Sequence, residues 1–281
     1  MSIKIIQERL DGYKAKSFQE EEMALREITQ EVALHALYNT DFYKHAAFQG
    51  GTCLRILYSL NRFSEDLDFA LIKPDLEFNF KNYQNLLKQE LEAFGFDIEI
   101  IERKDTDSTI KSIFIKESSI GNILNLQFQK SDGRPKSIKI KLEIDTNPPI
   151  GAVVENKYHN FPLNFSVTTY ELSSLFAGKI HALLSRTYTK GRDWYDFIWY
   201  TDRKTKINFP FLRNMLIQAG PWSNLDIQVD KEWIHSQLGN KITEIQWEEA
   251  VQDVQKFLKP YELKSLELWS KDFFLLKLKD L

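Results

Sequence analysis

Two aspartates separated by one residue are the feature of this sequence best suited to catalysis. Asp66 and Asp68 alternate with apolar residues, so on a strand both carboxylates would lie on one face, about 6.6 Å apart along the backbone. Carboxylate oxygens are hard ligands, and Mg²⁺ prefers them together with the phosphates of a substrate. The pair therefore predicts a divalent-metal site, although an isolated Asp-x-Asp is more typical of an exposed strand face or a loop.

A glycine pair precedes these aspartates. Gly50 and Gly51 stand between a short apolar run at 46–48 and a helical stretch at 52–59. Glycines at the start of a helix let the backbone approach a ligand closely and direct free amides at it, which suits a triphosphate. A glycine pair alone more often marks a tight turn. The interpretation of this pair as a phosphate-binding turn therefore depends on the metal-binding carboxylates that follow it.

A third carboxylate is expected on a neighbouring strand, and the segment IKIKLEIDTNPP supplies two candidates. Glu143 and Asp145 would share one face of that strand, so either could complete the metal site. We favour Glu143, because Asp145 borders the turn at Asn147-Pro148, where an aspartate often serves only to organise the backbone.

The elements that must position these residues follow from the patterning of apolar side chains. Helices are predicted over 17–38 and 79–94, the second ending before Gly95. Strands are predicted over 46–48, 66–71, 96–103, 110–115, 123–129 and 137–144, with a hairpin turn at 131–133 and with Asn147-Pro148-Pro149 closing the sheet. Later helices are predicted over 172–186, 194–201, 211–219, 231–238 and, broken near Pro260, 247–281.

These elements predict an α+β fold in which a mixed twisted sheet is flanked by helices and followed by a helical domain. We expect a core domain over 1–165 and a helical domain over 166–281 that completes the active-site cleft, with no linker-like segment between them. There is no internal repeat and no low-complexity tract.

Composition and charge restrict the class of protein. The chain is 43% hydrophobic and 27% charged, as in ordinary globular proteins. It has no apolar run long enough to cross a bilayer, and its start does not resemble a secretory signal. The lone Cys53 indicates a reducing cytoplasm and is expected to serve packing, and the spacing of the five histidines argues against zinc.

A net charge of -3 argues against a uniformly basic surface. Two local groups of basic residues are nevertheless present, and each is either a binding face or a solvated one: Lys136, Lys139 and Lys141, and Arg186, Lys190 and Arg192.

The order of glycine pair, helix, alternating carboxylates and later acidic strand resembles the polymerase-β-like nucleotidyltransferase superfamily. The sequence motifs resemble more closely still those of the AbiEii/AbiGii toxin family, the enzymatic half of certain bacterial type IV toxin–antitoxin and abortive-infection systems. Five segments carry this resemblance, in the same order over about 48–200: GGTCLR, RFSEDLDF, KLEIDTNPP, KIHALLSR and KGRDWYDF.

The resemblance implies roles for particular residues. Gly50, Gly51 and Thr52 would hold nucleotide phosphates, while Asp66 and Asp68 would bind catalytic metals. Three further residues near them are candidates for phosphate contacts or for structural work. Arg55, one helical turn past the glycines, would reach a phosphate or form a salt bridge that orients Asp66 or Glu65, and Arg62 and Ser64 would donate to phosphates or serve capping and solvation.

The family's other functional pair falls on Lys179 and on either Asp193 or Asp196. Lys179 lies in an apolar helix, where its charge suits nucleotide phosphates but where it could also snorkel at the helix edge. Asp193 could instead cap a helix that begins at Trp194, and Asp196 lies one turn further on.

The reaction that this resemblance implies is the attack of an acceptor hydroxyl on the α-phosphate of a nucleoside triphosphate, with two Mg²⁺ (or Mn²⁺) ions and pyrophosphate as the leaving group. The family suggests RNA acceptors, notably the 3′ end of tRNA, a growth-inhibiting toxin and a cognate antitoxin encoded nearby. Three alternatives remain: transfer to a protein or a small metabolite, a non-catalytic module that binds nucleotide or RNA, and a structural partner protein whose aromatic residues form an interface. The full set of carboxylates, glycines and lysine disfavours the second.

Overall fold

The computed structural model describes residues 2–103, 109–119, 124–128 and 138–281. The chain divides into two compact units. Unit 1 comprises Met1–Ser59, Phe63–Pro148 and Asn156–Thr169, and unit 2 comprises Leu60–Arg62, Pro149–Glu155 and Tyr170–Leu281.

Unit 1 is built on a mixed seven-stranded sheet with the order β3-β4-β5-β2-β1-β7-β6. The central pairs combine both directions, because β2 runs antiparallel to β1 but parallel to β5. The predicted α+β class, a mixed sheet flanked by helices, is thereby confirmed. The strands are β1 (Ala46–Gln49), β2 (Leu67–Leu71), β3 (Ile98–Arg103), β4 (Ile110–Glu117), β5 (Ile138–Asp145), β6 (Val154–His159) and β7 (Phe165–Tyr170).

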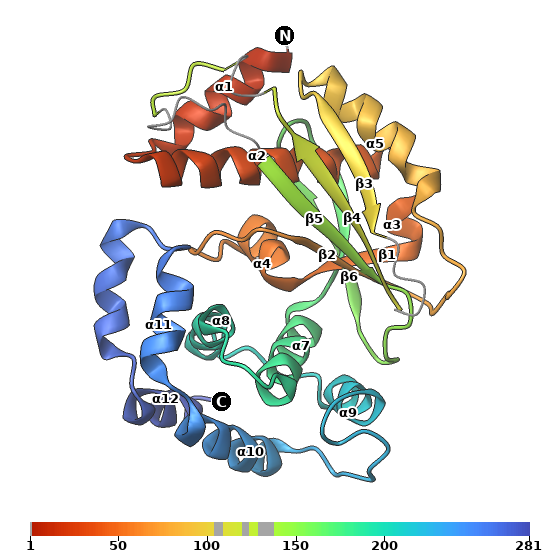
Figure 1. Ribbon diagram of the computed structural model, residues 1–281. Helices are drawn as coiled ribbons and strands as arrows, with labels where there is room; N and C mark the ends of the chain where they lie inside the picture. The colour runs from red at the N-terminus through yellow and green to blue at the C-terminus, as the bar shows by residue number, and fades with distance from the viewer. Residues whose placement is uncertain (1, 104–108, 120–123, 129–137) are drawn as a thin grey trace. The chain divides into compact units, whose positions relative to one another are not determined.

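Helices pack against this sheet (Figure 1). The long helix α2 (Phe18–Tyr38) crosses it and packs on β5 and on α5 (Lys81–Ala93), which in turn packs on β3. The side chain of Ser17 caps α2 by accepting a hydrogen bond from the amide of Glu20, which satisfies one of the free donors at the helix start. Both helices are those that the sequence predicts, and Gly95 has the positive φ, +91°, that the end of α5 requires.

Two short helices of unit 1 were not expected. Helix α1 (Ser2–Tyr13) buries Ile6 and Leu10, one turn apart, and packs on α2. Helix α3 (Phe42–His45) places Phe42 among other aromatic rings of the core, including Phe69 at 5.0 Å between centroids. Aromatic clusters of this kind are core packing, as in most globular proteins, and not an exposed interface.

The sheet differs from the prediction in two places. Residues 124–128 are not a strand, because the amides of Gln127 and Phe128 donate to the carboxylate of Glu21 on α2 and not to a neighbouring strand. The sheet also does not close at Asn147-Pro148-Pro149, since β6 and β7 follow. The turn predicted at 131–133 lies outside the described residues.

Unit 2 is helical, as predicted from residue 170 onward. The helices α7 and α8 pack on each other, and α9, α10, α11 and α12 pack around them. Trp194 anchors one side of this core, with Trp247 and Phe274 each 5.3 Å away between ring centroids. The elements are α7 (Leu172–Ser185), α8 (Gly191–Asp202), α9 (Phe209–Gln218), α10 (Lys231–Glu244), α11 (Trp247–Gln255), the 3₁₀ helix η1 (Pro260–Leu268) and α12 (Lys271–Leu278). Among the described residues, none of the helices has the length and apolar character needed to span a bilayer.

Candidate active site

Helix α4 (Gly50–Tyr58) begins directly after β1, without an intervening loop. Gly50 has φ +77°, a conformation that residues with a side chain rarely adopt. A Cβ atom at this position would overlap Oδ2 of Asp68, which lies on the adjacent strand β2. Glycine is therefore required at position 50 for two reasons, and the close approach that it permits brings the Asp68 carboxylate to the N-terminus of α4.

Asp66 and Asp68 lie where the alternation predicts. Asp66 immediately precedes β2, both aspartates are partly exposed, and Leu67 and Phe69 are buried. The hydroxyl of the fully buried Thr52 donates to the carbonyl oxygen of Asp66. Thr52 thus ties the loop that carries Asp66 to the first turn of α4, a structural role that the sequence did not suggest.

The register of β5 distinguishes the two candidates for a third carboxylate. Glu143 lies opposite Asp68 and Asp145 lies opposite Ala70, further from the glycine turn. Oδ1 of Asp145 accepts the amide of Asn147 at 2.9 Å, as expected of a turn-forming aspartate, and burial raises its pKa. Glu143 is therefore the acid adjacent to Asp68.

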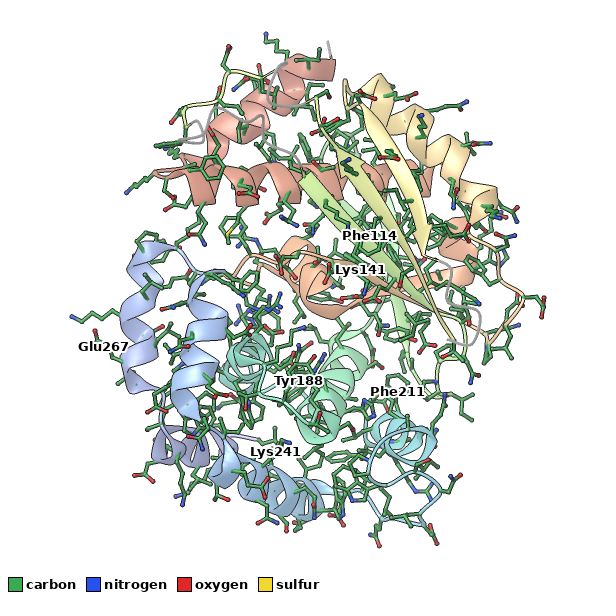
Figure 2. The ribbon with its side chains drawn as sticks, in the orientation of Figure 1. Phe114, Lys141, Tyr188, Phe211, Lys241 and Glu267 are labelled. Carbon is green, nitrogen blue, oxygen red and sulfur yellow. The ribbon has the colours of Figure 1, made fainter. Side chains whose placement is uncertain are left out.

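Glu143 is itself engaged by neighbouring side chains. Nζ of Lys141 lies 2.6 Å from its Oε1, and the hydroxyl of Ser112 donates to the same oxygen at 3.2 Å. Figure 2 labels Lys141 on β5 together with Phe114, its register partner on β4. The predicted third carboxylate thus forms an ion pair with a lysine from its own strand.

A divalent metal ion fits the donor set of Asp66 and Asp68. In the ranges that the structure describes, no group of three or more His, Cys, Asp or Glu side chains is arranged to hold a metal ion. Mg²⁺, however, is usually bound by one or two carboxylates, with water and substrate phosphates as its other ligands. Two partly exposed carboxylates beside a helix N-terminus meet that requirement without a third.

Side chains of α2 and α4 hold the surroundings of the two aspartates. Nε2 of Gln30 donates to the carbonyl oxygens of Ser64 and Glu65, at 3.3 and 2.8 Å, so the backbone before Asp66 is fixed by α2. Arg55 of α4 donates to Oε2 of Glu27 at 2.7 Å. Glu27 on α2 is a partner that the sequence did not suggest for Arg55.

A second cluster of charged side chains lies within unit 2 and centres on Lys179 of α7. Its Nζ lies 2.6 Å from Oδ1 of Asp193 and 2.7 Å from Oδ2 of Asp196, both on α8. The Lys179 side chain is only 12% exposed, so it does not snorkel to solvent. The sequence left open which of Asp193 and Asp196 pairs with Lys179, and in the structure both of them contact it.

Arg62 completes this cluster. The guanidinium of Arg62 makes a bidentate contact with Asp196, with both N–O distances at 2.7 Å, and both side chains are buried. Bidentate pairing fixes orientation as well as charge, so Arg62 positions Asp196.

Asp193 is not the helix cap that the sequence offered as its alternative role. Helix α8 begins at Gly191 with Lys190 at the N-cap position, and the amide of Asp193 donates to the carbonyl oxygen of Lys190. Asp193 therefore lies inside the first turn of α8, where a carboxylate is favoured by the helix dipole.

The charges in this cluster determine its protonation. Burial alone would raise the pKa of Asp193, but the charges of Lys179 and Arg186 outweigh it and lower that pKa to about 2. Burial would likewise lower the pKa of Lys179, yet Asp193 and Asp196 raise it. The lysine is therefore positive and Asp193 is negative at neutral pH.

Sequence reasoning did not assign a role to four residues around this cluster. Nε of Arg186 lies 2.9 Å from Oδ2 of Asp193. Lys190, Lys241 and Tyr188 line a small pocket together with Asp193. The sequence signalled two of these residues, since Arg186 and Lys190 belong to a local basic group with Arg192. It gave no signal for Lys241, which lies on α10, far along the chain.

The chain matches one family model and is similar to solved structures. The family model described as "Nucleotidyl transferase AbiEii toxin, Type IV TA system" matches residues 32–275. A putative nucleotidyltransferase from Helicobacter pylori is 19% identical, with a TM-score of 0.49 over 89% of this chain and 88% of that one. JHP933 from Helicobacter pylori is also 19% identical, with a TM-score of 0.49 over 92% of this chain and 89% of that one. No curated protein matches the chain.

Proposed function

We propose a specific reaction for this protein, whose chain belongs to the AbiEii nucleotidyl transferase toxin family of type IV toxin–antitoxin systems. The protein is a nucleotidyltransferase, and the proposed reaction moves a nucleoside monophosphate from a nucleoside triphosphate to a hydroxyl group of RNA. The supporting observation is the juxtaposition of Asp68 with Gly50 at the N-terminus of α4, beside Asp66.

In this reaction the oxygen of the acceptor hydroxyl forms a bond to the α-phosphorus. The bond between that phosphorus and the oxygen that bridges to the β-phosphate breaks, pyrophosphate leaves, and the proton of the hydroxyl passes to water. A divalent metal ion, Mg²⁺ or Mn²⁺, bound to Asp66 and Asp68 would supply charge neutralisation at the reacting phosphate. The first amides of α4, at Gly50 and Gly51, would hold phosphate oxygens, because a helix N-terminus presents unpaired N–H groups and a partial positive charge.

The remaining residues act by position. Thr52 fixes the backbone of Asp66, and Glu143 lies in register with Asp68. We propose that Lys179 also contacts the nucleotide phosphates, since the three cations around its site, Lys179, Arg62 and Arg186, exceed the two carboxylates, Asp193 and Asp196. Catalysis would then rest on positioning and electrostatics, as in most phosphoryl-type transfers.

The acceptor that we propose is the 3′ end of tRNA, and the consequence is inhibited growth. Family membership supports a toxin that is countered by an antitoxin. We propose that it acts in the cytoplasm and that a cognate antitoxin is encoded nearby. Transfer to a protein or a small metabolite uses the same chemistry, because the carboxylate and glycine geometry acts on the nucleotide and not on the acceptor.

Label transfer tests this proposal. Purified protein is incubated with Mg²⁺, with each α-³²P-labelled nucleoside triphosphate in turn, and with total RNA, total protein or a small-molecule extract. We expect label to appear in the tRNA band with one preferred nucleotide.

The matched controls are two alanine variants of acidic residues. Asp68→Ala removes one of the two proposed metal ligands, and Asp97→Ala removes an exposed carboxylate elsewhere in unit 1. Transfer should be lost in the first variant and kept in the second. Label on a polypeptide or on a small molecule would replace the proposed acceptor, and equal transfer by both variants would refute the proposed site.

A further inference from the structure

A pocket within unit 2 has a composition that the proposed reaction does not yet use. It lies beside the loop at 186–190, between α7 and α8, and we call it the α7–α8 loop pocket. Figure 2 labels Tyr188 and Lys241, which line it from this loop and from α10. Its charged and aromatic lining residues are Arg186, Tyr188, Lys190, Asp193, Trp194 and Lys241.

The α7–α8 loop pocket holds more positive than negative charge. Arg186, Lys190 and Lys241 line it, whereas Asp193 is its one acidic lining residue. That carboxylate is already shared between Lys179 and Arg186. Cations that are partly withdrawn from water without enough counter-charge are costly, and a bound anion offsets the cost.

Lys190 shows the effect of this surplus. Burial lowers its pKa, and the nearby charges of Arg192, Arg186 and Lys179 lower it further, while Asp193 opposes them. An anion bound beside Lys190 would therefore stabilise its charged form.

An aromatic ring borders these cations. Tyr188 is 60% exposed, and its hydroxyl accepts a hydrogen bond of 2.6 Å from Nη1 of Arg186. Lys241 in turn donates to the carbonyl oxygen of Arg186 at 2.8 Å. An exposed ring next to fixed cations is the combination by which proteins hold single-stranded nucleic acid, with bases stacked on rings and phosphates on cations.

We propose that the α7–α8 loop pocket binds a backbone phosphate of the acceptor RNA, with a neighbouring base stacked on Tyr188. This assignment rests on the proposed function and names the part of the protein that holds the acceptor. The ring favours an RNA strand over the triphosphate of the nucleotide. In a strand every phosphate adjoins two nucleosides, whereas the β- and γ-phosphates of a nucleoside triphosphate are separated from their own base.

The test measures binding without transfer. Fluorescence anisotropy follows a labelled single-stranded RNA octamer on the full chain in EDTA, without nucleotide, over a series of salt concentrations. Loss of one phosphate contact should reduce the slope of log K against log salt by about 0.7. We expect Lys190→Gln/Lys241→Gln to bind RNA about tenfold more weakly with that smaller slope. Lys231→Gln, an exposed lysine of the same helix α10, should bind as the wild type does.

Tyr188→Ala provides a second, independent test. Loss of a stacked base should weaken binding about tenfold and leave the salt slope unchanged, and Tyr188→Phe should retain most of the affinity. Because Tyr188 is exposed, this variant should fold even if the double lysine variant does not.

The outcomes separate this inference from the proposed function. Weaker RNA binding in both sets of variants supports the RNA assignment even if the wild type transfers no nucleotide. Unchanged RNA binding with weaker binding of inorganic pyrophosphate or ATP, measured by calorimetry, would assign the pocket to the nucleotide and overturn the inference. Unchanged binding of both would also overturn it.

Discussion

The position of Asp68 depends on the absence of a side chain at Gly50. At the scale of single residues, the Asp-x-Asp alternation was sufficient to predict which side chains are buried and which are partly exposed, because a strand has a period of two. The alternation could not reveal that Gly50 makes room for a carboxylate as well as for a ligand. That requires the register of Gln49 with Asp68, which is a tertiary property.

Gly50→Ala should damage both stability and transfer. The substitution forces alanine into a positive φ and brings its Cβ into Asp68, at a cost of roughly 1–3 kcal/mol in unfolding free energy. Displacement of the carboxylate should reduce nucleotide transfer at least about tenfold, since small misplacements are costly in positioned catalysis. Urea unfolding and label transfer measure the two effects.

Gly12→Ala is the matched control for this substitution. A Cβ atom at Gly12, which lies in α1, would meet no neighbouring atom within 4 Å beyond its own stretch of helix. Alanine there should leave stability unchanged or raise it by up to about 1 kcal/mol. Equal effects at both glycines would contradict the account of position 50.

The low pKa of Asp193 predicts an acid-dependent loss of stability. Its pKa is about 2 in the folded protein against an ordinary value of 3.8, so the unfolded chain takes up the proton first as the pH falls. The carboxylate therefore stabilises the folded state fully above about pH 4, by on the order of 2 kcal/mol, and this contribution is lost as the pH falls towards 2. Asp193→Asn should show a shallower fall in urea stability over that window, and an unchanged pH profile would contradict the pairing.

At the scale of elements, apolar periodicity predicted most helices and the central strands. It failed where local signals were weak or were overridden. Strand β6 alternates between exposed and partly exposed residues, so it has no buried face that a pattern could reveal. The segment 124–128 has strand-like residues, but its amides bind Glu21 of α2, a partner more than one hundred positions away.

The start of α8 shows how an element can depend on one small residue. A Cβ atom at Gly191 would overlap the carbonyl oxygen of Ala250 on α11, so the two helix backbones approach more closely there than a side chain allows. This contact packs α8, the helix that carries Asp193 and Asp196, against α11.

Gly191→Ala should therefore destabilise unit 2 by roughly 1–3 kcal/mol, because the backbone of α11 must move. Gly239→Ala within α10 is the control, since its Cβ would meet only Leu278, at 3.9 Å, and alanine is the better helix former. Urea midpoints measure both variants. A Gly191→Ala protein as stable as the wild type would show that the contact between α8 and α11 is unimportant.

At the scale of the whole molecule, the resemblance to a known family pointed to more of the candidate site residues than the apolar periodicity did. It brought together Lys179 and the KGRDWYDF segment, whose aspartates the structure places around that lysine. It did not predict that Arg62 binds Asp196, 134 positions away, or that Lys241 lines the same pocket as Asp193. Such pairings depend on how the chain folds back on itself, and no spacing in the sequence encodes them.

In the proposed reaction, Asp66 and Asp68 support nucleotide transfer with a divalent cation. The most direct measurement is single-turnover label transfer by the wild type and by Asp66→Asn/Asp68→Asn, with and without Mg²⁺, after thermal unfolding shows that both proteins are folded. Asparagine keeps the size of each side chain but removes its charge. We predict Mg²⁺-dependent transfer by the wild type and a loss of at least about a thousandfold in the folded variant, of the order of 4 kcal/mol in transition-state stabilisation. Comparable transfer by both proteins would contradict the account.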